Sequence, residues 1–299
     1  MLHGKNLLTL KWVCEALQVS RSGYYNWVKR QEYREAKEEK DQADFMIILK
    51  AYHLYEKACG SRGIYMRLLH QGIKMNRKKI QRLMRKYQLF CSIRKPNPYK
   101  KIARATQENI TKPNILNRQF KDSEPKTVIL TDITYIPYGQ GQVAYLSVMK
   151  DCRTKQILAY ELSESLAVDF VLNTVTKLLK HHQIPKQQKT LIHSDQGTHY
   201  TSIAFQTILK DNELRQSMSR RGNCWDNAPV ESFFGHMKDD LPDLSLVRDY
   251  SAIQQIVDDH MHYYNNYRYQ WDLAKLSPNQ FEQYLKTGVH PLSHLIDVA

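Results

Sequence analysis

The chain has 299 residues, of which 42% are hydrophobic and 10% aromatic, so it can form two or three compact units and is not a disordered chain. No stretch approaches the roughly 20 consecutive apolar residues that span a bilayer, and the first residues lack a signal-peptide pattern, so we expect a cytoplasmic protein with no membrane partner. Five scattered cysteines without a CxxC pair argue against a zinc or redox centre and indicate reduced thiols.

The charge is distributed unevenly along the chain. The formal net charge is +14, with 26 Lys and Arg against 9 Asp and Glu in residues 1–120, and 18 against 21 in residues 121–299. Cationic side chains bind phosphates and release condensed counterions, so the first part is expected to bind a polyanion, either DNA or RNA. A basic surface that serves only solubility is the alternative, because charge alone describes association and not fold.

Residues 8–30 have the pattern of two short helices. Apolar residues recur at helical spacing in LTLKWVCEAL, and Ser20 or Ser22 can cap a second helix after a turn at Gln18 and Val19. This pattern predicts a helix-turn-helix, with an ordinary helical hairpin as an equal alternative. The charged stretch QEYREAKEEKDQ then pairs opposite signs at i,i+4 spacing, which predicts a solvated helix or linker.

A second helical region extends from about residue 42 to residue 90. Apolar residues at helical spacing predict three helices, the last of which begins at Asn76, a good N-cap residue. The exposed positions of this last helix are strongly basic, which makes it the candidate for contact with DNA. These positions are Arg77, Lys78, Lys79, Arg82, Arg85 and Lys86.

The segment that follows has three prolines, many basic residues and little periodicity, which predicts an extended linker able to lie along DNA. The expected domains are therefore a helix-turn-helix with a charged helix (1–40), a helical DNA-binding domain (41–92), a basic linker (93–124), an α/β core (125–285) and a C-terminal tail (286–299).

From residue 125 onward, β-strand patterns replace helical ones. Three β-rich runs, KTVILTDITYIPY, QVAYLSVMKDC and KQILAYELS, are separated by turn signals and predict an antiparallel meander. A helix, a strand, a helix, a strand and a helix from about Asp226 follow, and YSAIQQIVDDHMHYYNNYR adds another helix. This order predicts an α/β core of ribonuclease-H-like fold, with a mixed five-stranded sheet and flanking helices, preceded by an all-α helix-turn-helix region.

Three acidic residues stand out in this core. Asp132 lies inside the first strand among apolar residues, where an unpaired charge requires compensation. Asp195 follows the apolar run TLIHS directly, and Glu231 follows Asn227 and Pro229 at the start of a helix. Taken singly, Asp195 is typical of a turn residue and Glu231 of a solvated helix residue.

The combination of these acids is more specific than its members. Positions 196 to 230 place 35 residues between Asp195 and Glu231, which together with Asp132 gives the DD(35)E arrangement. Lys238 follows Glu231 by seven residues, close to two helical turns, so it lies on the same face and can contact phosphate.

The residue types indicate a metal site for phosphodiester chemistry. Hard cations such as Mg²⁺ prefer oxygen ligands, and three carboxylates leave coordination sites for water and phosphate. Two ions about 3.5 to 4 Å apart can activate a nucleophile and stabilise the leaving oxygen of an in-line displacement. We therefore expect two Mg²⁺ ions held by Asp132, Asp195 and Glu231, with Mn²⁺ as a substitute.

Several neighbouring residues are weaker candidates. His193 and His199 flank Asp195 and can position water or phosphate, although packing or hydrogen bonding is the commoner role of such histidines. Trp225 and Asn227 can line a DNA channel, with Trp225 stacking on a splayed base, but both can equally serve only to build the loop and helix cap.

At these residues the sequence resembles the transposases of bacterial insertion sequences, specifically the second reading-frame product of the insertion sequence three family, and more distantly retroviral integrases. The resemblance covers nearly the whole chain. It rests on VSRSGYYNW, RKKIQRLMRKYQL, TDITYI, HSDQGTHYTS, SRRGNCWDNAPVESFFGHMK, YNNYR and LSPNQF. Ile129 departs from the tryptophan that is common in relatives, and the zinc pattern of the retroviral branch is absent.

The resemblance implies an integrase core that binds metal through Asp132, Asp195 and Glu231, cleaves DNA at element ends and joins the freed 3′ hydroxyl to target DNA. It also implies a homo-oligomer on DNA and the upstream reading-frame product of the same element as a partner. Two alternatives remain open: a DNA-binding regulator with an inactive core, and a structure-selective nuclease of the same fold.

Overall fold

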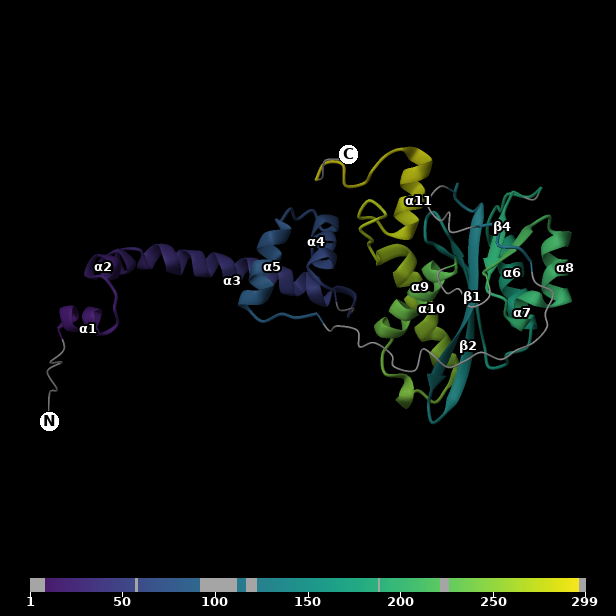
Figure 1. The fold of residues 1–299 in the computed structure, drawn as a ribbon, viewed down its shortest axis with the longest axis horizontal. Helices are drawn as coiled ribbons and strands as arrows, with labels where there is room; N and C mark the ends of the chain where they lie inside the picture. The colour runs from purple at the N-terminus through teal and green to yellow at the C-terminus, as the bar shows by residue number, and fades with distance from the viewer. Residues whose placement is uncertain are drawn as a thin grey trace. The chain divides into compact units, whose positions relative to one another are not determined.

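The computed structural model of the chain describes residues 9–56, 59–91, 112–116, 123–187, 189–220 and 226–295. Two compact units are present, residues 1–68 with 73–91 and residues 69–72 with 92–299. The helices before the sheet are α1 (Leu10–Ala16), α2 (Arg21–Lys29), α3 (Gln31–His53), α4 (Ser61–His70) and α5 (Arg77–Lys86), with a 3-10 turn at Leu54–Glu56 (Figure 1). No helix in these described ranges is both long and apolar enough to cross a membrane.

The helices begin at the predicted caps. The Ser20 hydroxyl accepts a hydrogen bond from the Gly23 amide at 3.0 Å, and Asn76 Oδ1 accepts one from the Lys78 amide at 2.8 Å. Cys14 is the buried side chain of α1, and α2 buries none, so this hairpin has little core of its own. The expected division at residue 40 lies inside α3, which is one continuous helix.

The core of the first unit is formed by α3, α4 and α5. Its buried side chains are Ile48, Ala51, Ile64, Leu68, Met75, Ile80, Leu83 and Met84. Three helices around a shared apolar centre, with a short turn between the last two, form the trihelical arrangement of helix-turn-helix proteins.

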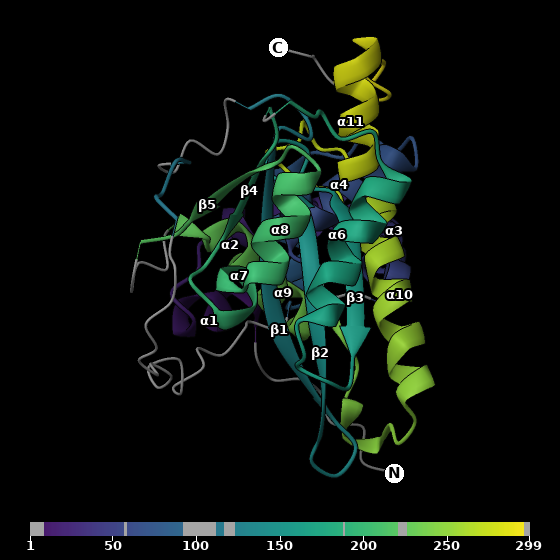
Figure 2. The same cartoon turned by 90° about the vertical axis from the view of Figure 1, so that its right-hand side faces the viewer.

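The second unit contains a five-stranded sheet of order β3-β2-β1-β4-β5. Strands β1 (Val128–Tyr138), β2 (Gln142–Asp151) and β3 (Ile157–Ser163) form the antiparallel meander, and β4 (Leu191–Ser194) and β5 (Arg215–Met218) continue the sheet parallel to β1 (Figure 2). This topology confirms the predicted mixed five-stranded sheet and its order of elements.

Helices cover both faces of the sheet. One face packs on α6 (Asp169–His181) and α8 (Ile203–Asp211), with the short α7 (Thr198–Thr201) beside α8 (Figure 2). The other face packs on α9 (Ala228–Asp240) and α10 (Tyr250–Tyr267), which are joined through a 3-10 turn at Leu244–Leu246. Strands buried on both faces explain the nearly continuous apolar runs around Asp132.

The C-terminal helix α11 (Pro278–Thr287) was not predicted as an element, although its start carries a recognisable signal. Ser277 and Gln280 form a reciprocal capping box, Pro278 occupies the first turn, and Gly288 ends the helix at a φ of 69°. These are the residue types that favour the two ends of a helix.

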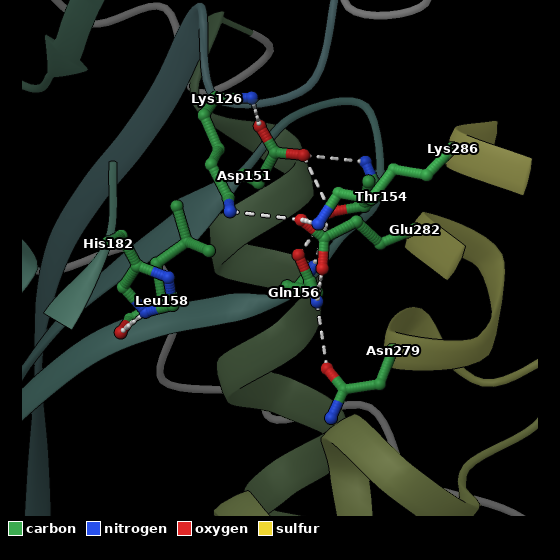
Figure 3. A network of polar contacts seen from close by, with 9 residues as sticks. All are labelled: Lys126, Asp151, Thr154, Gln156, Leu158, His182, Asn279, Glu282 and Lys286. Carbon is green, nitrogen blue, oxygen red and sulfur yellow. Dashed lines mark hydrogen bonds and ion pairs between the residues drawn. The ribbon is translucent and has the colours of Figure 1, made fainter. Parts of the chain in front are cut away.

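A polar network attaches α11 to the sheet (Figure 3). Glu282 forms ion pairs of 2.9 Å with Lys126, just before β1, and with Lys286. Gln156 donates to Glu282 at 2.9 Å and to Asn279 at 2.8 Å. Burial alone would raise the pKa of Glu282, but these hydrogen bonds outweigh it and lower the pKa to about 2.

Most of the predicted linker lies outside the described residues, but residues 112–116 lie along β5. The Pro113 carbonyl accepts from the Met218 amide at 3.4 Å, and the Ser217 hydroxyl accepts from the Ile115 amide at 2.9 Å. Because β5 is an edge strand, this segment covers backbone groups that would otherwise be open to another strand.

Candidate functional site

Three separate elements bring the acidic residues together. Asp132 lies in β1 and Asp195 comes directly after β4, which pairs with β1 in parallel. Leu130 is level with His193 in this pairing, so two residues farther along each strand Asp132 and Asp195 are neighbours. Glu231 lies in the first turn of α9, on the face of the sheet that α9 covers.

The charges of Asp195 and Glu231 both act on Asp132. Burial raises the pKa of Asp132 well above its usual value, and the negative charges of Asp195 and then Glu231 raise it further. Burial also raises the pKa of Asp195. The side chain of Asp132 is half-buried and that of Asp195 is exposed, so solvent can reach the carboxylates.

Backbone amides fix two of the carboxylates. Asp132 Oδ1 accepts from the Ile133 amide at 2.8 Å, and Asp195 Oδ1 accepts from the Gly197 amide at 2.9 Å. A Cβ atom at Gly197 would lie 2.9 Å from Asp195 Oδ1, which is closer than carbon atoms normally approach oxygen. Glycine at this position therefore keeps the Asp195 carboxylate in place.

Lys238 is the cation that acts on this cluster. Its charge lowers the pKa of Asp132, while its own pKa is lowered by burial and raised by the charge of Asp132. It follows Glu231 by two turns of α9, as predicted, and it is exposed enough to meet a ligand.

The donor set fits a hard divalent cation, because carboxylate oxygens are the ligands that Mg²⁺ prefers and their mutual repulsion is relieved by positive charge. Within the described ranges, however, no three His, Cys, Asp or Glu side chains are gathered closely enough to enclose an ion as they stand. An ion shared by all three acids would therefore require side-chain rotations from these positions.

The two flanking histidines have structural partners. His193 is fully buried, and its Nδ1 and Nε2 lie 2.9 Å and 3.2 Å from the hydroxyls of Ser217 and Ser219. Burial lowers its pKa to about 4, so it is neutral at physiological pH. His199 Nε2 lies 2.7 Å from the Leu166 carbonyl oxygen. These contacts favour the packing and hydrogen-bonding role for both.

Tyr200 in α7 is a neighbour of the site that sequence reasoning missed. Its side chain is 1% exposed, and its hydroxyl lies 3.4 Å from the Thr131 hydroxyl. Burial and then the charges of Asp132 and Asp195 raise its pKa well above the usual value. Tyr200 lies in the polar run THYTS, which gives no sequence signal for this proximity.

The loop before α9 is only partly described. Trp225, an expected DNA contact, lies outside the described residues. Asn227, also expected to contact DNA, is 3% exposed, and its Nδ2 donates to the Thr131 carbonyl at 3.3 Å. Asp226, near the expected start of this helix, forms a bidentate ion pair with Arg220 at 3.0 Å and accepts from Asn114 at 2.9 Å.

The basic residues of α5 divide between two faces. Lys79 pairs with Asp44 of α3, Arg82 binds both oxygens of Asp41 at 2.7 Å, and Lys86 pairs with Glu38 and with Asp41 at 2.8 Å. Lys79, Arg82 and Lys86 are thus engaged within the helical unit.

Lys78 and Arg85 lie on another face of α5, and both are exposed. Gln81 lies one turn from each, and its amide donates to the Ser61 hydroxyl at 3.3 Å. Residues at i, i+3 and i+7 share one side of a helix, so these three form a single polar stripe. Arg77 is half-buried at the first position of the helix.

Comparison with known proteins identifies one domain in the helical region and two in the core. Residues 39–97 match an HTH-like domain, and residues 122–224 and 212–278 match integrase core domains. The chain is 32% identical over 259 residues to a transposase for insertion sequence element IS904 of Lactococcus lactis, covering 86% of this chain and 97% of that protein.

Similarity extends to a second transposase and to a solved structure. Transposase InsF for insertion sequence IS3A of Escherichia coli is 28% identical over 276 residues, covering 92% of this chain and 94% of that protein. The HTLV-2 integrase catalytic core domain in complex with magnesium has a TM-score of 0.41 and 15% identity, covering 52% of this chain and 96% of that chain.

Proposed function

The chain belongs to the insertion sequence three family of bacterial transposases, which are polynucleotidyl transferases with an integrase core, and from this premise we propose that Asp132, Asp195 and Glu231 form its active site. The supporting observation is the effect of two acids on the third: the charges of Asp195, at the end of β4, and Glu231, on α9, raise the pKa of Asp132 on β1.

The three carboxylates would hold two Mg²⁺ ions, with Mn²⁺ as a substitute. Such ions supply activation of a nucleophile and stabilisation of the leaving oxygen in phosphodiester chemistry. The protein contributes fixed positions for the acids: Asp132 and Asp195 are each held by a backbone amide, and Glu231 is carried on a helix packed against the sheet.

Lys238 would bind a phosphate of the DNA strand beside the acids. Its exposed ammonium group and its effect on Asp132 place positive charge next to the negative cluster. A phosphodiester that approaches three carboxylates is repelled by them, so a lysine at the edge of the cluster would help to orient the scissile strand.

The transposase would bind the terminal repeats of its element through the helical unit, with α5 as the candidate recognition helix. Exposed Lys78 and Arg85 support this role. Two element ends must be joined to one target, so we propose a homo-oligomer on DNA in the bacterial cytoplasm. The upstream reading-frame product of the element is the proposed protein partner.

Strand cleavage and joining on labelled duplexes that end in the element's own repeat, with Mg²⁺, test the proposal. The wild type is compared with Asp132→Asn, Asp195→Asn and Glu231→Gln. We expect the wild type to cleave and join, and all three variants to bind DNA without performing either step. Variants that cleave normally would show that the active site lies elsewhere.

The same assay separates the two alternatives. A wild type that cleaves but never joins would favour a nuclease, and one that binds the repeat but performs neither step would favour a regulator with an inactive core. Mixing wild-type subunits with Glu231→Gln subunits tests the oligomer, because a shared assembly predicts a loss of joining beyond simple dilution.

A further inference from the structure

Lys150 occupies a core position beneath helix α9. On this face of β2 the alternating residues Ala144, Leu146, Val148 and Cys152 belong to the apolar core against α9 and α10. Lys150 continues that alternation and is 4% exposed. A buried ammonium group costs free energy unless it is paired, so the structure must offer it a specific contact.

That contact is the first turn of α9. Lys150 Nζ donates to the Pro229 carbonyl at 2.8 Å, two residues before Glu231, and lies 5.6 Å from the centre of the Phe233 ring. No ion pair is recorded for Lys150 in the described part of the chain. The groups whose charges act on Lys150 are Lys155, Cys152, Asp272 and Arg268, and two of these are also cations.

Burial, followed by the charge of Lys155, lowers the pKa of Lys150 to about 7. The neutral amine still carries two N–H groups, so the bond to Pro229 does not depend on the charge. Lys150 therefore holds the Pro229 carbonyl as a hydrogen-bond donor and not as one partner of an ion pair.

A second polar contact binds the same turn to β1. Asn227 Nδ2 donates to the carbonyl of Thr131, the residue before Asp132. The first turn of α9 is thus fixed to β1 by Asn227 and to β2 by Lys150. These two strands are paired with each other from Ile129 to Tyr138.

We propose that Lys150 is a positioning residue for Glu231, which fixes the start of α9 relative to the strand that carries Asp132. This inference rests on the proposed metal site. Residues that orient a metal ligand typically change metal affinity or activity by about 10- to 100-fold when they are removed.

The test measures Mn²⁺ binding to the full chain by electron paramagnetic resonance, together with the melting temperature and strand joining. Lys150→Met keeps the apolar stem and removes the donor. We expect its Mn²⁺ affinity to fall by about 10- to 100-fold, with unchanged affinity for repeat DNA. Lys150→Arg, which keeps a donor, should recover part of the loss.

Arg268→Met is the matched control, because Arg268 pairs with Asp240 at the other end of α9. We expect it to lower the melting temperature while Mn²⁺ affinity stays within about twofold of wild type, since the first turn of the helix keeps its contacts. Equal losses in Lys150→Met and Arg268→Met would overturn the proposal, as would wild-type Mn²⁺ affinity in Lys150→Met.

If Lys150→Met does not fold, Lys150→Leu decides the question by the same criteria, because leucine fits the apolar face of β2 and has no hydrogen-bond donor. A wild type that binds no Mn²⁺, or a Glu231→Gln variant that binds Mn²⁺ as the wild type does, would instead contradict the proposed active site. The two failures are therefore distinguishable.

Discussion

Acidic residues have opposite surroundings in the two units of the chain. In the helical unit, Asp41 accepts two hydrogen bonds from Arg82 and one from Lys86, and these contacts lower its pKa. In the core, Asp132 faces two other carboxylates, and burial and their charges raise its pKa. The first arrangement stabilises the folded state, whereas the second destabilises it.

The difference separates structural charge from functional charge. A compensated pair such as Asp41 and Arg82 stabilises packing and leaves nothing for a ligand to satisfy. A cluster of like charges without enough cations destabilises the folded state, and such local destabilisation is typical of functional sites. Substitutions in the two regions should therefore change stability in opposite directions.

Asp132→Asn should have the largest effect on activity. If Asp132 binds metal as proposed, its loss removes several kcal/mol of transition-state stabilisation, so we expect joining to fall by about 1,000-fold or more. The same change should raise the melting temperature in metal-free buffer, because a repelled, buried carboxylate is removed. Strand-transfer assays and calorimetry with a chelator measure the two effects.

The pH dependence of that stability has a defined sign. The folded pKa of Asp132 lies above its unfolded value, so the wild type binds more protons when folded and loses stability as pH rises above about 4. The gain in the free energy of unfolding of Asp132→Asn over the wild type should therefore grow as pH rises from about 4 to the folded pKa of Asp132. An advantage that is constant with pH would contradict the assignment.

Lys78→Ala and Arg85→Ala should have the next largest effect, and on DNA binding alone. Each contact to a base or phosphate is worth about 1–3 kcal/mol, so we expect affinity for the terminal repeat to fall about tenfold per substitution. Lys79→Ala removes the same charge one residue away from Lys78, but its side chain pairs with Asp44. Fluorescence anisotropy should show a smaller loss of DNA affinity for this control. Equal losses would show that the ion-paired face of α5 contributes to DNA binding as much as the exposed face does.

Gly197→Ala should reduce joining by about tenfold with little change in melting temperature, because a misplaced catalytic group loses at least 1.4 kcal/mol. The added Cβ would displace the carboxylate of Asp195. The residue has an ordinary negative φ of −62°, so alanine is not strained by the backbone itself. Wild-type joining in a folded Gly197→Ala variant would show that Asp195 tolerates displacement.

Asp41→Asn should have the smallest effect, a loss of about 1 kcal/mol in the free energy of unfolding, because its partners Arg82 and Lys86 are partly exposed. The folded pKa of Asp41 is depressed, so this contribution is present above about pH 4 and is lost as pH falls further. Denaturant titration at pH 7 and at pH 3 should show the difference shrinking in acid, opposite in sign to the effect at Asp132.

Much of the core could be predicted from the sequence because its signals are local. Alternating apolar residues and turn residues give the five strands, and the spacing of Asp132, Asp195 and Glu231 identifies the acids before any contact is known. Helix α11 was missed although Ser277, Gln280 and Gly288 mark its two ends and Phe281, Tyr284 and Leu285 follow helical spacing in its interior.

Side-chain contacts between residues that are distant in sequence could not be predicted. The basic residues of α5 look alike in the sequence, and only the packing of α3 divides them into residues bound to Glu38, Asp41 and Asp44 and residues open to solvent. Likewise, nothing near Lys150 in the sequence distinguishes it from a lysine at a strand end.

The sequence by itself therefore determined the order of elements and the basic character of the helical unit, and it singled out the three candidate acids, because periodicity and spacing are properties of the chain alone. The tertiary structure alone decided which charges are compensated, since that depends on which helix packs on which face. It brought Glu231 near Asp132 and placed Lys150 beneath Pro229, contacts that arise only when α9 closes over the sheet.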